Sequence, residues 1–290
     1  MTIAACYVSP EGVVFGADST STYPGPGGPD RHYNYAQKIF QVGGPDSTLG
    51  VTMWGMGGLG ELSYRTLIAQ FGDDLAANPA PDMATLAQRF ADRFWHEFSS
   101  RRVDQLHRAH ELNGNPNRTP AENDELEDLL GSFSGGFCLG GCLLTDRMPR
   151  AYEIGYDPTM VGSPQPGALQ LGQPQFWGCP NLIRRLIFGI DFQMLQAIQN
   201  SPHWTGTQQD LVNLLVPHIL ATPTTLPIRE AIDWIHASVY STIKAMKFSQ
   251  LAPVCGGPVE IAAITTDRPF RWVRHKTLEA AIEQGGLGNA

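Results

Sequence analysis

The chain of 290 residues contains 20 Lys or Arg and 28 Asp or Glu residues, which gives a formal net charge of −8. Hydrophobic residues make up 42 % and charged residues 17 %, and this balance excludes a disordered acidic chain and a coiled coil. Because the acidic chain has no extended cluster of Lys and Arg, we expect no nucleic-acid partner.

Membrane contact and disulfide bonds are not expected either. No run reaches the roughly 18 apolar residues of a membrane helix, and the N-terminus lacks a signal-peptide pattern, so we expect a cytoplasmic protein. The five cysteines include no CxxC pair, which predicts buried thiols. His107 and His110 lack an acidic ligand at a fixed spacing, so we expect surface histidines and no metal or other cofactor.

A β-hairpin is predicted at the N-terminus. Two apolar, β-prone segments separated by turn residues would form its strands, at 2–8 and 13–17. If Val8 pairs with Val13, Asp18 is adjacent to the residue that faces Thr2. The next segment, 23–30, contains three prolines and three glycines and is expected to be a surface loop.

Further along, blocks of strands alternate with blocks of helices. Strands are expected at 38–42, 49–54, 137–144, 150–154, 168–171, 259–265 and 270–273. Helices are expected at 61–75, 82–112, 181–200, 208–220 and 227–248. Such an order is typical of an α+β protein in which two antiparallel sheets pack face to face with helices outside.

One domain, 1–290, is expected, with a helical and acidic insertion at about 96–134. Within it, residues 113–131 are polar and acidic, which predicts a solvated segment. The predicted helix at 82–112 carries more large aromatic residues than are needed to cover one sandwich face, namely Phe94, Trp95 and Phe98. We therefore expect a closed homo-oligomer.

The strand at 49–54 leads into four glycines within six residues, 55–60. A phosphate-binding loop is not favoured, because no Lys-Ser/Thr follows and no βαβ alternation surrounds it. Two interpretations remain: close packing of a helix on a strand, or backbone N–H groups that hold an oxyanion.

Thr2 is a candidate nucleophile. Met1 precedes a small residue, which suits removal of Met1 and would leave Thr2 with a free amine. An α-amine, whose pKa is about 7.7 to 8.0, can act as a base at neutral pH. Lys38 would favour the alkoxide and Asp18 would hold Lys38 in place; the alternative is an ordinary surface ion pair.

The first forty residues combine these candidates in one pattern, formed by Thr2, Gly12, Val13, Val14, Ala17, Asp18, Thr22, Lys38 and Ile39. This pattern resembles the β-type subunits of the proteasome and their bacterial relatives, which are N-terminal-nucleophile (Ntn) hydrolases. The interval of 16 residues from Thr2 to Asp18 equals the family's. Segments 227–232 and 256–265 are similar to a late helix and a Gly-rich strand entry of that family.

The resemblance implies a four-layer αββα sandwich and a set of roles. Thr2 would attack an amide carbonyl, Lys38 held by Asp18 would stabilise the alkoxide, and the Gly55 N–H would donate to the oxyanion. Gly57 is the alternative oxyanion donor, and no cofactor is implied.

The resemblance also implies how a substrate would bind. Thr22 would align its backbone, and Met53 would form the base of the pocket for the side chain before the cut bond. Because Met53 is apolar, as are Ala36 and Phe40 beside Lys38, we expect a preference for apolar side chains.

Three departures from the family pattern stand out. Thr20 occupies a position where the family has Arg, and Cys179 and Cys255 stand near positions of supporting serines. The chain is also longer than the family's core.

The leading hypothesis is a self-compartmentalising threonine peptidase that forms a homo-oligomeric ring. Its substrate would be a peptide or an unfolded protein, and an unknown unfoldase would be a possible partner. The alternatives are a non-catalytic ring-forming scaffold subunit and an amidase acting on small molecules.

Overall fold

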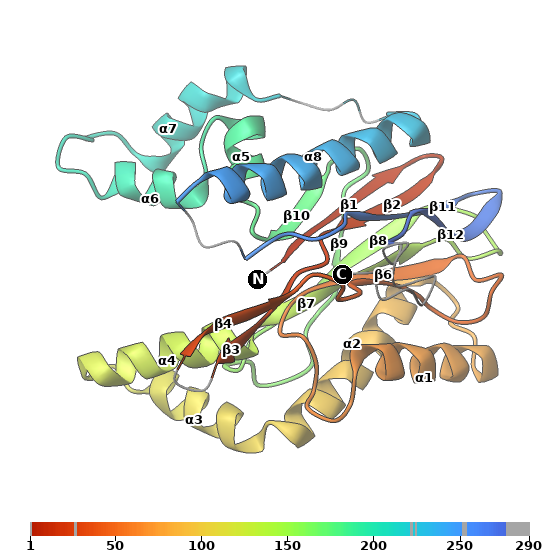
Figure 1. The fold of residues 1–290 in the computed structure, drawn as a ribbon, viewed down its shortest axis with the longest axis horizontal. Coiled ribbons are helices and arrows are strands. Elements are labelled where there is room, and N and C mark those ends of the chain that lie inside the picture. Colours follow the sequence, from red (N-terminus) through yellow and green to blue (C-terminus); the bar gives the residue numbers. More distant parts are fainter. Residues whose placement is uncertain (1, 26–27, 221–222, 224, 251–253, 277–290) are drawn as a thin grey trace, which may run out of the picture.

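Two antiparallel sheets of five strands each pack face to face in the computed structural model, and helices cover both outer faces (Figure 1). The structure describes residues 2–25, 28–220, 223, 225–250 and 254–276. The predicted four-layer sandwich is confirmed. Within the described ranges, no helix combines the length and apolarity that crossing a membrane requires.

The first sheet has the order β10-β1-β2-β11-β12 and the second has the order β5-β6-β7-β8-β9. The strands of the first sheet are β1 (Ile3–Ser9), β2 (Gly12–Ala17), β10 (Gln175–Gly178), β11 (Glu260–Thr265) and β12 (Arg268–Arg274). Those of the second are β5 (Ile39–Gln41), β6 (Leu49–Gly55), β7 (Gly135–Gly141), β8 (Arg150–Tyr156) and β9 (Gly167–Ala168).

The N-terminal hairpin has the predicted register. Val8 pairs with Val13, and Ala4 pairs with Ala17. Both strands are buried along their whole length, because one face of the hairpin packs on a helix and the other on the second sheet. Asp18, which follows β2, therefore enters the interior of the sandwich beside the start of β1.

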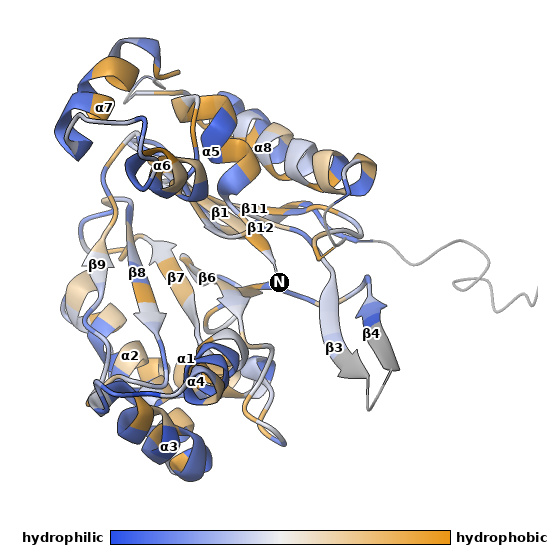
Figure 2. Ribbon diagram, turned by 90° about the vertical axis from the view of Figure 1, so that its left-hand side faces the viewer, coloured by the Kyte–Doolittle hydropathy of each residue, from blue (hydrophilic) through white to orange (hydrophobic). Residues whose placement is uncertain are grey.

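The segment predicted to be a surface loop at 23–30 forms most of a second hairpin, so that prediction is wrong. Its strands are β3 (Ser21–Gly25) and β4 (Gly28–Tyr33), which pair only with each other and stand away from the sandwich (Figure 2). A strand that pairs on one side can accommodate proline where an N–H would face solvent. Counting prolines therefore did not distinguish a loop from an isolated hairpin.

Helices α1 (Tyr64–Ala77) and α2 (Met83–Arg101) cover the second sheet, and α8 (Ile228–Phe248) and α5 (Asn181–Phe188) cover the first. Two of the expected long helices are divided. The helix expected at 82–112 breaks at Arg102, and α3 (Val103–Gly114) follows. The helix expected at 181–200 breaks at Gly189, whose φ is +74°, and α6 (Phe192–Gln199) follows. Beyond these lie α7 (Gln208–Leu215) and η1 (Val216–His218).

Most of the acidic stretch predicted to be a solvated segment is helix α4 (Pro120–Phe133). It begins with a capping box between Thr119 and Glu122 and packs on α3 through a small apolar cluster. Its far end leads directly into β7. The segment expected to be an insertion, 96–134, thus contains the end of α2 and the helix pair α3 and α4, and whether it is an insertion stays a prediction.

Phe94 and Phe98 are fully buried within this chain, where they contact Phe137 and Tyr156. Trp95 packs beside Phe98 at the edge of the same cluster. These aromatic residues therefore do not exceed the needs of one sandwich, and that part of the prediction is wrong. They form the core between α2 and the second sheet.

Candidate active site

Asp18 and Lys38 form a buried ion pair. The Lys38 Nζ lies 2.6 Å from Asp18 Oδ1, and the two side chains are 3 % and 0 % exposed. Lys38 also donates to the carbonyl oxygen of Thr20 at 2.5 Å. The interpretation of these residues as an ordinary surface pair is therefore excluded.

Backbone donors hold the Asp18 carboxylate in place. Its Oδ1 accepts from the Ile3 N–H at 3.1 Å, and its Oδ2 accepts from the N–H groups of Thr20 and Gly256 at 3.2 and 2.9 Å. The Asp18 N–H in turn donates to the Ile3 carbonyl at 3.1 Å. Asp18 is thus fixed against the residue that follows Thr2, and it fixes Lys38 there.

Thr2 is itself buried, with 3 % of its surface exposed. Its carbonyl oxygen accepts from the Cys179 N–H at 2.7 Å, which ties it to the segment after β10. The start of β1 lies between the two helical layers in both views (Figures 1 and 2). Met1 lies outside the described residues.

A cavity of about 600 Å³ opens at Thr2, between the ends of the two sheets. The first sheet contributes Thr2 and Gly178 to its wall, and the second sheet and the end of α4 contribute the rest. Its lining residues are Thr2, Trp54, Gly55, Leu130, Ser134, Gly135, Glu153, Gly155, Tyr156, Asp157 and Gly178. Thr2 and Gly55, which the sequence analysis assigned to one site, therefore share one cavity.

Two glycines of this cavity have backbone conformations that favour glycine. Gly55 has φ of +81°, and a Cβ there would lie 2.3 Å from the Ser134 carbonyl oxygen. Gly178 has φ of +79°, and a Cβ there would lie 1.9 Å from the Thr2 carbonyl oxygen. Close packing of the backbone therefore explains why position 55 is a glycine. The role of the Gly55 N–H as an oxyanion donor remains a prediction.

The other predicted substrate-binding residues are absent from the described lining of this cavity. Thr22 lies on β3, where its Oγ1 is 3.0 Å from His32 Nδ1. Met53 is buried in the core that faces α1 and α2, together with Phe40. Gly57 is exposed in the loop after β6, and Ala36 lines a separate hollow beside the β3–β4 hairpin.

Cys179 and Cys255 lie on the two segments that hold Thr2 and Asp18. Their thiols hydrogen-bond to each other; this contact lowers the pKa of Cys179 and, with burial, raises that of Cys255. None of the five cysteines, all within the described ranges, forms a disulfide. Thr20, which stands where the resembled family has Arg, donates its hydroxyl to Asn34 Oδ1 at 2.8 Å.

No sequence pattern indicated the second buried carboxylate near the site, which belongs to Glu260. Glu260 begins β11 opposite Ala17, the neighbour of Asp18, and its side chain is fully buried. His275 Nδ1 and Lys276 Nζ lie 2.7 and 3.2 Å from its Oε1. The nearby Lys38 charge adds to the main effect of burial in lowering the pKa of Lys276. Residues that follow β12 thus form a second ion pair with a buried carboxylate, within the electrostatic influence of Lys38.

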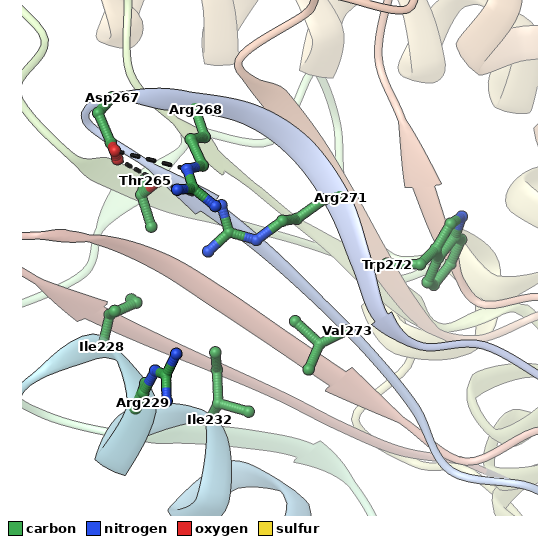
Figure 3. A pocket seen from close by; sticks show the side chains of 9 residues that line it. All are labelled: Ile228, Arg229, Ile232, Thr265, Asp267, Arg268, Arg271, Trp272 and Val273. Carbon is green, nitrogen blue, oxygen red and sulfur yellow. Dashed lines mark hydrogen bonds and ion pairs between the residues drawn. The ribbon is translucent and has the colours of Figure 1, made fainter.

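A separate hollow of about 530 Å³ has mainly basic residues among its charged lining. It lies between the start of α8 and the β11–β12 turn, and Arg229, Arg268 and Arg271 line it with one acid, Asp267 (Figure 3). It contains none of the predicted site residues. Among the described residues, no three His, Cys, Asp or Glu side chains gather as a metal ion would require.

Comparisons with known proteins identify the fold. No protein-family model matches the chain, and no curated protein does. Among solved structures, the Anbu (Gly-1) mutant from Hyphomicrobium sp. strain MC1 is similar with a TM-score of 0.52 and 13 % identity, over 98 % of this chain and 91 % of that one. Anbu (ancestral beta-subunit) from Yersinia bercovieri is similar with a TM-score of 0.50 and 12 % identity, over 95 % and 88 %. At these identities the likeness shows a shared proteasome-like fold.

Proposed function

We propose that this chain is an N-terminal threonine hydrolase that cleaves peptide bonds through an acyl-enzyme. The observation that carries the proposal is the buried Asp18–Lys38 pair, fixed through Ile3 beside a threonine that opens onto a cavity. A buried ion pair costs desolvation free energy, so its place next to a nucleophile favours a chemical role over a purely structural one.

The proposed reaction has two steps. With Met1 removed, the Thr2 Oγ attacks the substrate carbonyl while the Thr2 amine, directly or through water, takes the hydroxyl proton. Lys38 stabilises the developing alkoxide, and the Gly55 N–H donates to the oxyanion. The amine returns the proton to the leaving nitrogen, and water then hydrolyses the ester to release the acid and restore Thr2.

The proposal is tested with the full chain and fluorogenic peptides. Thr2→Ala and Lys38→Ala should each reduce kcat/KM by at least about a thousandfold, because the two groups act as a unit. Thr2→Ser is the matched control, since it keeps both a hydroxyl and an amine, and it should retain measurable activity.

Mass spectrometry separates the hydrolase from a non-catalytic scaffold. The purified chain should lack one Met residue, and an electrophilic peptide probe should add to Thr2 with a single mass increment. Retention of Met1 in cell-made protein would refute the mechanism, because no free amine would be available as base. A Thr2→Ala protein with full activity would also refute it.

A further inference from the structure

The cavity at Thr2 carries charge of one sign. Its charged lining residues are Glu153 and Asp157, both acidic, and no Lys, Arg or His of the described chain lines it. The apolar pocket predicted from Met53, Ala36 and Phe40 lies elsewhere, because none of these residues is in the described lining of this cavity. A substrate side chain that enters this cavity therefore meets an acidic wall.

Strand alternation explains why Glu153 faces the cavity. On β8, Ala151 packs in the core between the sheets, and Glu153 and Gly155 lie on that same side at successive alternate positions. Ile154, between them, faces the opposite core against α2. Glu153 is thus the point on β8 where the apolar interior gives way to the cavity.

Gly155 leaves space beside the Glu153 carboxylate. Four glycines, Gly55, Gly135, Gly155 and Gly178, line the cavity, and a Cβ on Gly155 would meet no atom within 4 Å. At the other three, a Cβ would lie 2.5 Å or less from a backbone carbonyl oxygen, so close packing accounts for them. A long side chain extending from a substrate held at Thr2 can therefore lie over Gly155, two residues along β8 from Glu153.

Glu153 has no ion-pair partner in the described part of the chain. It is half-buried, and its cross-strand neighbour on β7 is the buried thiol of Cys138. Burial raises the pKa of this thiol, and the Glu153 charge adds to that effect. Asp157 is already engaged, because its Oδ1 accepts from the Thr159 N–H at 2.7 Å. A half-buried carboxylate that lacks a counter-charge gains from a bound cation.

We propose that the cavity at Thr2 binds a cationic substrate side chain, Lys or Arg, and that Glu153 is the residue that pairs with it. The inference rests on the proposed function, since it states which type of substrate side chain precedes the bond that Thr2 would cleave. Leu130, near the end of α4, would contact the apolar stem of such a side chain, and Glu153 its charged end.

The kinetic test compares otherwise identical fluorogenic peptides with Arg, Lys, Leu or Glu before the scissile bond. The natural chain should cleave the Arg and Lys peptides with the highest kcat/KM and the Glu peptide with the lowest. Glu153→Gln should lower kcat/KM for the Arg peptide by roughly 10- to 100-fold, mostly through KM, and leave the Leu peptide within about twofold. Glu127→Gln, an exposed acid on α4 outside the cavity, is the matched control and should change nothing.

A binding test distinguishes this inference from the proposed function. In the Thr2→Ala chain, calorimetry should detect the Arg peptide binding more tightly than the Leu peptide, and Glu153→Gln added to it should remove the difference. Binding with this preference but no cleavage by the natural chain would overturn the hydrolase and keep the inference. Cleavage with equal or greater preference for Leu or Glu would overturn the inference and keep the hydrolase.

Discussion

At Asp18, three backbone N–H groups and the Lys38 ammonium converge on one buried carboxylate. Each donor offsets part of the cost of burying the charge, and the carboxylate in turn offsets the cost of burying Lys38. The two charges are therefore interdependent, and removal of one leaves the other buried without its counter-charge.

Asp18→Asn should lower the free energy of unfolding by about 3 to 5 kcal/mol, because the Lys38 ammonium is then left unpaired inside the sandwich. The double variant Asp18→Asn/Lys38→Met, which removes both charges, should regain much of this stability without regaining peptide hydrolysis. Urea denaturation measures both effects.

The control for these stability measurements is Asp146→Asn, which breaks an exposed ion pair with Arg150. That change should cost at most about 1 kcal/mol. A double variant no more stable than Asp18→Asn alone would contradict the account, because it would place the loss in the backbone hydrogen bonds instead of the unpaired charge.

At the scale of elements, the sequence predicted what local patterns determine. The register of β1 and β2 follows from a short turn between two apolar runs, so the proximity of Thr2 and Asp18 could be predicted from spacing alone. Strand β10 was missed, because four residues that end in Gly178 form a strand only where the edge of β1 offers hydrogen bonds.

The helix break at Arg102 and the acidic wall of the cavity were missed for a related reason. Arg102 is neither Gly nor Pro, and its φ of −125° and ψ of 31° mark an interruption that no local sequence signal indicates. Glu153 and Asp157 reach Thr2 through the pairing of β6, β7 and β8, so no sequence interval relates them to the nucleophile. Tertiary packing decides both features.

Helix α4 supplies Leu130 to the cavity, and its end leads into Ser134, so its stability bears on the site. Thr119→Ala removes the cap and should weaken the first turn by about 1 kcal/mol, measured as faster hydrogen exchange of α4 amides. Thr145→Ala, an exposed loop change, should leave this exchange unaltered. Unaltered exchange in Thr119→Ala would show that packing on α3 alone holds the helix.

The Thr119–Glu122 capping box also predicts that the stability of the first turn of α4 depends on pH. The Thr119 backbone N–H, followed by its hydroxyl, lowers the pKa of the Glu122 carboxyl below its usual value. A carboxyl whose pKa is lower in the folded state contributes stability above its ordinary pKa and loses it as the pH falls through the lowered value. Protection of the first turn should therefore decline on acidification, and Glu122→Gln should remove most of this decline.

At the scale of the whole molecule, apolar side chains are exposed together on the outer helices of the first sheet. Helices α5, α6 and α7 group at the same end of the molecule in both views, and Figure 2 shows hydrophobic residues on each. The exposed apolar residues of this α5–η1 surface are Leu186, Phe188, Phe192, Met194, Val212, Leu214, Val216 and Leu220. Exposed apolar side chains on neighbouring helices are typical of an interface.

We expect this α5–η1 surface to be buried in a closed homo-oligomer, in place of the α2 aromatic residues that pack inside the chain. Light scattering at micromolar concentration should give a mass several times 31.7 kDa. Phe192→Glu with Leu214→Glu should shift it toward the monomer, because two charges cannot be buried there without partners. Val161→Glu, at an apolar residue that is 93 % exposed outside this surface, should leave the mass unchanged. A monomeric natural chain would contradict the expectation and leave the cavity at Thr2 open to solvent.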